Sequence, residues 1–310
     1  MNATTLLDLR PLSIGELFDR TFRLFRRHFV TFILIAIIMQ LPVAVLQIAS
    51  ALLVNNLTNN IVFDPTAQNP FLNTEILGPT LLVSFGIAFV SFIVTQVGMA
   101  ALTQAVADSY LGRKVSFDNA FSRMGNTWFT LILASIVAGL FIFGLTIPIL
   151  LVSFIPCLGA LVALVGFFFI GAIASILVSL LPPVVVLERA GVLEAVKRAW
   201  TLSRLRFWWV LGYLVLLTIL TVVIIFGPSA VLGFALGTVL GGTSILVQSI
   251  VQQSATLVLT AVFLPIRIAA ITLMYFDLRI RFEGFDLMVL AKAGESASNN
   301  ASDLPNQSLL

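Results

Sequence analysis

Arg267 is the residue whose type and position most strongly suggest chemistry. It lies in a long apolar stretch about ten residues before Asp277, which corresponds to roughly 15 Å of helix. A guanidinium placed there either extends to the membrane surface or pairs inside the bundle with Asp108 or Glu188. The alternative is a site for an anionic headgroup or solute. Pro265, two residues earlier, removes a backbone donor and can kink the helix.

Acids and amides provide the other polar groups near or within apolar segments. Asp108, Glu188 and Asp277 each follow an apolar segment at the same end, and we expect them to form salt bridges with neighbouring arginines. Hydrogen bonding between helices is expected for the buried glutamines, and a polar transport path is the alternative. The candidates for this polar interior are Gln40, Gln96, Gln248 and Gln252.

Catalytic and metal-binding patterns are missing from the sequence. His28 and Cys157 are the single histidine and cysteine, and together they cannot build a zinc site. There is no glycine-rich phosphate loop and no Gly-x-Ser-x-Gly elbow. We therefore expect no catalytic residues, no metal, no cofactor and no enzymatic activity.

The composition predicts a membrane protein. Of 310 residues, 59% are hydrophobic and only 10% are charged, whereas soluble domains are about a quarter charged. The mean hydropathy is +1.09. Several apolar runs exceed the roughly 20 residues that cross a hydrocarbon core, so we predict an all-α, polytopic helical bundle.

Six transmembrane helices are expected between a segment 1–12 and a disordered tail 291–310, within a membrane domain 13–290. They are predicted at Phe29–Val54, Pro79–Ala107, Thr127–Ile155, Leu158–Leu187, Phe207–Phe226 and Ser244–Phe276. The glycine-rich stretch Gly227–Thr243 has three interpretations: a re-entrant turn, an interfacial turn or the start of the sixth span.

All 17 Lys and Arg residues fall on one predicted side of these spans. Basic loops stay in the cytoplasm, so we expect both termini to be cytoplasmic. The net charge of +3 reflects this bias, and no nucleic-acid partner is expected. The loop Asn55–Gly78 contains no Lys or Arg and is predicted to lie outside.

An internal threefold repeat is the next signal. An amphipathic stretch precedes each predicted hairpin, at Ser13–Phe29, Ser116–Phe129 and Gly191–Trp209. We expect three cytoplasmic interfacial helices whose apolar faces enter the membrane. In the first, Ser13 and Glu16 form a capping box, and the apolar face comprises Leu17, Phe18, Thr21, Phe22 and Phe25. In the third, the apolar stripe comprises Leu193, Val196 and Trp200.

Three sequence blocks resemble a bacterial family named for the membrane domain of glycerophosphoryl diester phosphodiesterase. They are LRPLSIGELFDRTFRLFRRHF, LLPPVVVLERAGVLEAVKRAWTLSRLRFWWVLGY and YFDLRIRFEGFDL. The resemblance covers about Arg10 to Leu287 and implies a membrane fold in a bacterial cytoplasmic membrane. It does not carry over the enzyme, because a catalytic barrel of roughly 250 residues has no room here.

The expected function is therefore to bind, organise or transport lipid or a small amphiphile. The expected partners are membrane lipids with anionic headgroups, with a protein partner at the cytoplasmic face as a further possibility. The alternatives are a small-solute transporter and a membrane anchor for a separate enzyme. The candidate anion-binding residues are Arg20, Arg23, Arg26, Arg198, Arg204, Arg206 and Arg267.

Overall fold

The computed structural model describes residues 12–59, 74–113, 115–155, 158–239 and 244–284. Within these ranges the regular structure is entirely helical. Six helical segments are long and apolar enough to cross a membrane, as the sequence predicts. They are Phe29–Asn56, Gly78–Tyr110, Thr127–Ser153, Gly159–Glu188, Phe207–Thr238 and Leu246–Glu283. The predicted tail 291–310 lies outside the described residues.

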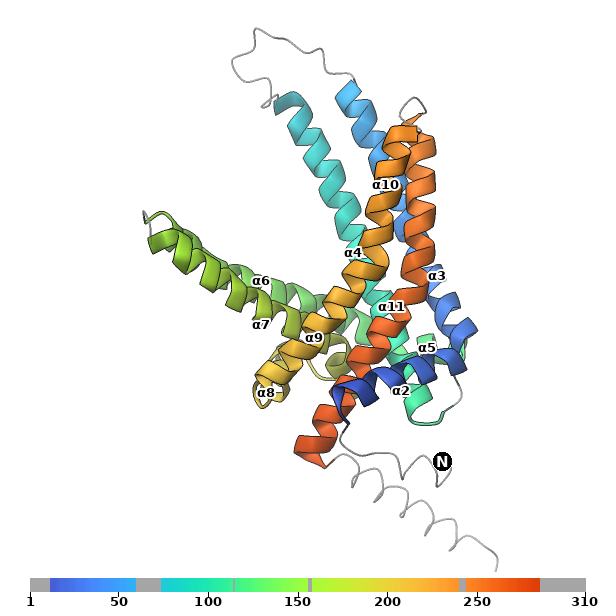
Figure 1. Cartoon of the computed structure of the whole chain (residues 1–310), viewed down its shortest axis with the longest axis vertical. Coiled ribbons are helices and arrows are strands. Elements are labelled where there is room, and N and C mark those ends of the chain that lie inside the picture. The colour runs from blue at the N-terminus through green and yellow to red at the C-terminus, as the bar shows by residue number, and fades with distance from the viewer. Residues whose placement is uncertain (1–11, 60–73, 114, 156–157, 240–243, 285–310) are drawn as a thin grey trace, which may run out of the picture.

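Three hairpins contain these segments, and a short helix precedes each hairpin (Figure 1). The hairpins are α3 (Phe29–Asn59) with α4 (Thr74–Tyr110), α6 (Thr127–Ser153) with α7 (Leu158–Glu188), and α9 (Phe207–Thr221), η1 (Val222–Phe226) and α10 (Gly227–Val239) with α11 (Ile245–Glu283). The short helices are α2 (Ile14–Arg27), α5 (Phe117–Met124) and α8 (Val192–Arg204).

The fifth span is longer than the sequence prediction, and the three interpretations of Gly227–Thr243 are wrong for its described part. Residues Gly227–Val239 form α10, which continues the fifth span. The π-helical turn η1 joins α9 to α10, and the Gly227 N–H donates to the Val222 carbonyl five residues earlier. Pro228 follows directly and has no N–H for the regular bond to Ile224, which favours this wider turn.

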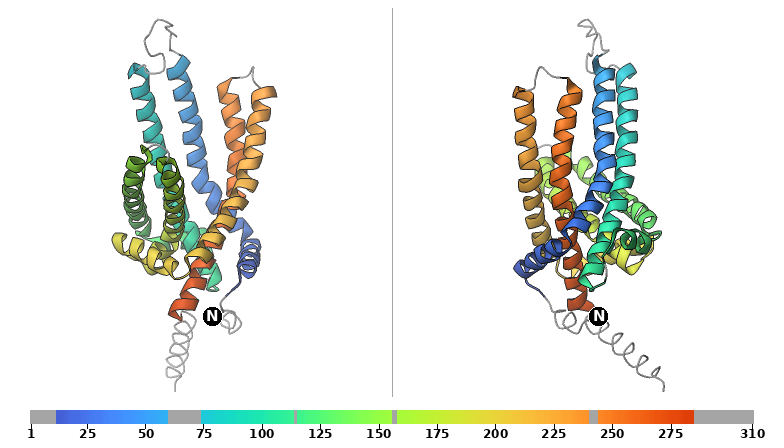
Figure 2. Two further views of the ribbon diagram at one scale, coloured as in Figure 1. Left: turned by 60° about the vertical axis from the view of Figure 1, so that its left-hand side comes forward. Right: turned by 90° about the vertical axis from the view of Figure 1, so that its right-hand side faces the viewer.

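The helices converge at one end of the molecule and separate toward the other (Figures 1 and 2). In α4, residues 100–108 are buried whereas Leu81, Leu82 and Phe85 are exposed. The other hairpins show the same gradient toward the end that carries Asp108, Glu188 and Asp277. We name this the charged end, and the opposite end the remote end. The protein core therefore lies in the half next to the charged end.

Helix α11 is the central element of this core. It packs against α3, α4, α7 and α2, and its apolar window is far more buried than those of the other five spans. The buried Tyr213 hydroxyl on α9 donates to the Ala270 carbonyl on α11 at 3.0 Å. In the hairpin of α3 and α4, a Cβ at Gly98 would lie 3.0 Å from the Met39 Cβ, so a small residue permits this close approach.

Each short helix packs against the second helix of a hairpin. Helix α5 packs on α4, α8 packs on α7, and α2 packs on α11 at the other end of the sequence. The predicted capping box is present in α2, where the Ser13 N–H donates to Glu16 Oε2 at 2.8 Å.

The buried face of α2 differs from the sequence expectation, whereas the predicted stripe of α8 remains accessible. In α2, Leu17, Thr21 and Phe25 are buried against the protein instead of entering a membrane. In α8, Leu193 of the predicted stripe is 64% exposed, which agrees with a face that meets lipid, and a second face comprising Ala195, Ala199, Leu202 and Ser203 is buried against the protein. Helical periodicity identifies an apolar face but does not say whether protein or lipid covers it.

A polar clamp holds the start of the described chain to α11. Asp277 is almost fully buried, and its Oδ1 accepts the Leu12 N–H at 2.7 Å. Arg281 donates to Asp277 Oδ2 at 2.7 Å and to the Leu12 carbonyl at 2.6 Å. One ion pair thus satisfies both backbone groups of a residue 265 positions away in sequence. It fixes where α2 begins.

The first prediction concerns this clamp. Asp277→Asn removes the charge that holds Arg281, and we expect the free energy of unfolding to fall by about 2 kcal/mol, because charged hydrogen bonds contribute about that much. Thermal unfolding in detergent measures the effect. The matched control is Asp19→Asn in the exposed pair with Arg23, which should change stability by less than about 0.5 kcal/mol. Equal effects of the two substitutions would contradict a stabilising role for the clamp.

Candidate functional site

The charged end contains ion pairs of all three acids, as the sequence predicts. Asp108 is buried and accepts from Arg123 of α5 at 2.9 Å and from Arg113 at 3.5 Å. Asp277 is held by Arg281, as described above. The carboxylates of Asp108 and Asp277 are therefore each paired with at least one arginine.

Glu188 is the centre of a larger network between α7, α8 and α11. It receives two hydrogen bonds from Arg198, at 2.8 and 3.2 Å, and one from the Tyr275 hydroxyl at 2.6 Å. Glu283 joins the network by pairing with both Arg198 and Arg279. Burial alone would lower the pKa of Arg198, but its bonds to Glu188 and Glu283 raise that pKa above the ordinary value. The network therefore fixes α8 and is a structural device.

Arg267 is different from these arginines. It is half-buried in α11, about 24 Å of helix before Glu283. In the described part of the chain, no ion pair or hydrogen bond reaches its side chain. The predicted pairing with Asp108 or Glu188 is wrong, because other arginines already occupy both acids. A cation without a partner at this depth is a strong indication of a binding function.

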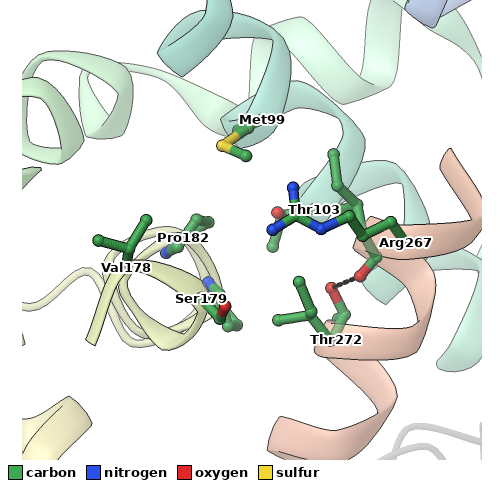
Figure 3. Close-up of a pocket in the computed structure, with 10 residues that line it drawn as sticks. Met99, Thr103, Val178, Ser179, Pro182, Arg267 and Thr272 are labelled. Carbon is green, nitrogen blue, oxygen red and sulfur yellow. Dashed lines mark hydrogen bonds between the residues drawn. The ribbon is translucent and has the colours of Figure 1, made fainter. Parts of the chain in front are cut away.

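A small cavity lies beside Arg267, between α4, α7 and α11 (Figure 3). Its volume of about 20 Å³ is room for one or two waters, since one water needs roughly 10–15 Å³. Figure 3 shows the Arg267 side chain extending toward Thr103 of α4. Thr103 is fully buried, and its hydroxyl has no hydrogen-bond partner in the described structure. The cavity therefore contains two polar groups that a ligand could satisfy.

Two consecutive prolines add acceptors to the same cavity. Pro182 and Pro183 of α7 line it together with Val178 and Ser179. Because proline has no N–H, the carbonyls of Val178 and Ser179, each four residues earlier, lose their regular helical donors. Backbone carbonyls are thereby freed next to an unpaired guanidinium.

A larger groove lies on the other side of Arg267, between α11 and the fifth span. Its volume of about 580 Å³ is within the usual range of small-molecule sites. The groove residues are Thr221, Ile225, Phe226, Ser229, Ala230, Gln252, Thr256, Thr260, Phe263, Leu264 and Arg267. The η1 turn contributes Ile225 and Phe226, so the irregular part of the fifth span forms a wall of the groove. Sequence reasoning missed this wall, although Pro228 was a signal for it.

The other predicted site residues do not gather around Arg267. Of the four candidate glutamines, Gln252 lines the groove, whereas Gln40, Gln96 and Gln248 are not among the residues that line either cavity. Arg23, Arg26 and Arg204 are exposed, and Arg206 lies over the Trp209 ring at 5.1 Å. Arg20 donates to the Tyr110 hydroxyl at 3.4 Å.

Comparisons of the chain with protein-family models, curated proteins and solved structures find no match.

The second prediction separates a functional arginine from a structural one. Arg267→Met removes an unpaired charge from a membrane interior, which costs roughly 2.5–3.5 kcal/mol to place there, so thermal stability in lipid-free detergent should rise. The same substitution at Arg279, which pairs with Glu283 at 3.0 Å in the same helix, should lower stability. A loss of stability at Arg267 as large as at Arg279 would show that Arg267 has a structural partner.

Proposed function

We propose that this protein is a non-enzymatic, multi-pass membrane protein that binds the anionic group of an amphiphile at Arg267. The observation that carries the proposal is an unpaired guanidinium at mid-span that lines two cavities. The guanidinium is a strong donor to phosphate and carboxylate. The surrounding walls are mostly apolar, which suits a ligand with hydrocarbon chains.

The position of Arg267 deep within the sixth span favours a bound ligand over a role at the membrane surface. The side chain would need to extend far along α11 to reach the charged end, and Figure 3 shows it extending instead toward Thr103 and into the cavity. Charged groups at such positions typically mark substrate or ion pathways. A small-solute transporter is the second candidate, and the polar residues of the groove favour it. An anchor for a separate enzyme has no comparable structural support.

A second element of the proposal is a basic collar at the charged end. We infer that α2, α5 and α8 are the three copies of an ancestral repeat, since each precedes a hairpin and each packs on the last helix of one. The exposed Arg23, Arg26 and Arg204 are available to anionic headgroups. The family resemblance and the excess of basic residues at this end support a bacterial plasma membrane with cytoplasmic termini.

The third prediction tests binding at Arg267. The full chain is purified in nanodiscs that contain phosphatidylethanolamine and phosphatidylglycerol, and retained lipid is measured by native mass spectrometry. Arg267→Met should weaken retention roughly tenfold, the loss expected for one charge-assisted bond, and Arg267→Lys should retain part of it. Arg113→Gln, an exposed arginine that pairs with Asp108 and is not part of the proposed collar, is the matched control and should bind normally.

Two outcomes of this experiment contradict the proposal or redirect it. Lipid retention that is unchanged in Arg267→Met excludes Arg267 as the binding group. Competition by millimolar inorganic phosphate, with no preference for lipid, would favour the small-solute alternative.

The fourth prediction tests the orientation. A reporter active only in the cytoplasm, fused after Leu310, should be active in cells. The same reporter inserted at Asn69, in the predicted exterior loop, should be inactive. The reverse pattern would place the basic collar outside and overturn this part of the proposal.

A further inference from the structure

The groove between α11 and the fifth span has a second polar point, far from Arg267. The Gln252 side chain donates to the Ser229 carbonyl at 3.2 Å, and both residues line the groove. The Gln252 Oε1 and the Ser229 hydroxyl are buried, and neither has a hydrogen-bond partner within the described residues. An unpartnered acceptor and an unpartnered donor therefore lie on two residues in direct contact. We name Ser229 and Gln252 the distal pair.

The π-helical turn brings Ser229 into the groove. Thr221 and Ser229 both line it, although they are eight positions apart in the fifth span. Two turns of a regular α-helix take roughly seven residues, so the eighth would be rotated away from the groove. The η1 turn, Val222–Phe226, is wider than an α-helical turn and takes up the additional residue. The irregular turn that forms a wall of the groove thus also positions the distal pair.

Between Arg267 and the distal pair the groove is mainly apolar. The hydroxyls of Thr221 and Thr256 donate to backbone carbonyls four positions earlier in their own helices, at 2.7 and 2.9 Å, so neither requires a ligand. Thr260 adds one hydroxyl that can donate or accept. A ligand that extends from Arg267 to the distal pair must therefore have an apolar body. The remaining lining residues are Ile225, Phe226, Ala230, Phe263 and Leu264.

The spacing of the two polar points defines the length of that body. Gln252 lies fifteen positions before Arg267, which is about 22 Å of α11. An extended hydrocarbon chain with C–C bonds of about 1.5 Å advances roughly 1.3 Å per carbon, so about 17 carbons span the two Cα positions. The side chains of Arg267 and Gln252 both extend into the groove and shorten this gap to about a dozen carbons.

We propose that the groove binds an extended anionic amphiphile, with its anionic group at Arg267 and a hydroxyl group, about a dozen carbons along its chain, at the distal pair. A hydroxyl has one donor and two acceptor positions, so it can donate to the Gln252 Oε1 and accept from Ser229. A methylene in that place satisfies neither buried group. This inference rests on the proposed binding at Arg267 and adds the ligand's second contact and its length.

The ligand class is a fatty acid hydroxylated near the middle of its chain. Such a chain can enter the groove from the bilayer, because Phe226 lines the groove and is exposed to the surroundings of the helices. The same chemistry occurs in a free hydroxy acid and in a phospholipid that carries such an acyl chain. The two sources differ in the anionic group, which is a carboxylate in the first and a phosphate in the second.

The test compares stearate with 2-hydroxystearate and 12-hydroxystearate, which differ only in the hydroxyl. Each hydroxy acid competes with deuterated stearate for the purified full chain in detergent, and native mass spectrometry measures the ratio of the bound acids. 12-Hydroxystearate should bind roughly tenfold more tightly than stearate, the factor corresponding to one hydrogen bond to a buried, otherwise unpartnered group. 2-Hydroxystearate carries its hydroxyl beside the carboxylate, out of reach of the distal pair, and should bind like stearate.

Variants of the distal pair give the specific readout. The double variant Ser229→Ala and Gln252→Leu removes the donor and the acceptor, so the preference for 12-hydroxystearate should fall to about onefold while stearate binds as before. The matched control is the double variant Gln253→Leu and Ser254→Ala, which makes the same chemical changes at neighbouring positions of α11 that do not line the groove. It should keep the full preference.

A second arm distinguishes the two sources of the ligand. Phosphatidylglycerol with a 12-hydroxystearoyl chain competes with the same phospholipid carrying a deuterated stearoyl chain. A preference for the hydroxylated phospholipid that is larger than the preference among the free acids assigns a phosphate to Arg267. A preference confined to the free acids assigns a carboxylate. Either result supports recognition at two points.

The outcomes also separate this inference from the proposed function. If binding depends on Arg267 but neither the acids nor the phospholipids show a preference for the 12-hydroxy form, the anion site stands and the distal contact is wrong. A preference that persists in the Ser229 and Gln252 double variant would also overturn the distal contact. Binding of all these ligands that is unchanged in Arg267→Met would contradict the proposed function itself.

Discussion

A hydrocarbon core does not tolerate an unsatisfied charge, and this constraint organises the whole molecule. Arg113, Arg123, Arg198, Arg279 and Arg281 all have carboxylate partners at the charged end. The ion pairs of Glu188 also join the second and third hairpins, because Glu188 of α7 pairs with Arg198 of α8 and accepts from Tyr275 of α11. Electrostatic pairing and close packing therefore coincide in the same half of the bundle, and the remote half is left to interact with lipid.

Arg267 is the exception to this rule, and its neighbours are exceptions to regular helix geometry. Pro182 and Pro183 free two carbonyls in α7, and η1 widens the fifth span beside the groove. Interrupted helices within a membrane are stable where they line a cavity or are covered by protein. The irregular segments of the fourth and fifth spans thus occur where α11 presents an unpaired cation, and this coincidence supports a site more strongly than any one residue.

The sequence was sufficient for the coarse fold, because the length and apolarity of a span are local properties. It also identified Arg267 and the acids of the charged end, since charges in apolar segments are rare. It failed for Gly227–Val239, because the five glycines and one proline of the longer stretch Gly227–Thr243 suggested a turn, although a helix in lipid satisfies its own backbone regardless of propensity. It also failed for the face of α2, because amphipathicity does not reveal that α2 packs on α11 with Leu17 and Phe25 buried in protein. Which polar groups meet around Arg267 depends on packing between helices distant in sequence.

The residues that line the two cavities explain how the charge of Arg267 can be stabilised inside a membrane while it still attracts an anion. Its guanidinium has five donors, and the acceptors near it are neutral carbonyls and hydroxyls. Neutral acceptors can solvate the charge, directly or through water, without neutralising it, so the site keeps its attraction for an anion. A carboxylate at the position of Thr103 would stabilise the protein more and abolish that attraction. The absence of an acid among the residues lining either cavity is therefore the feature that distinguishes a binding site from another structural ion pair.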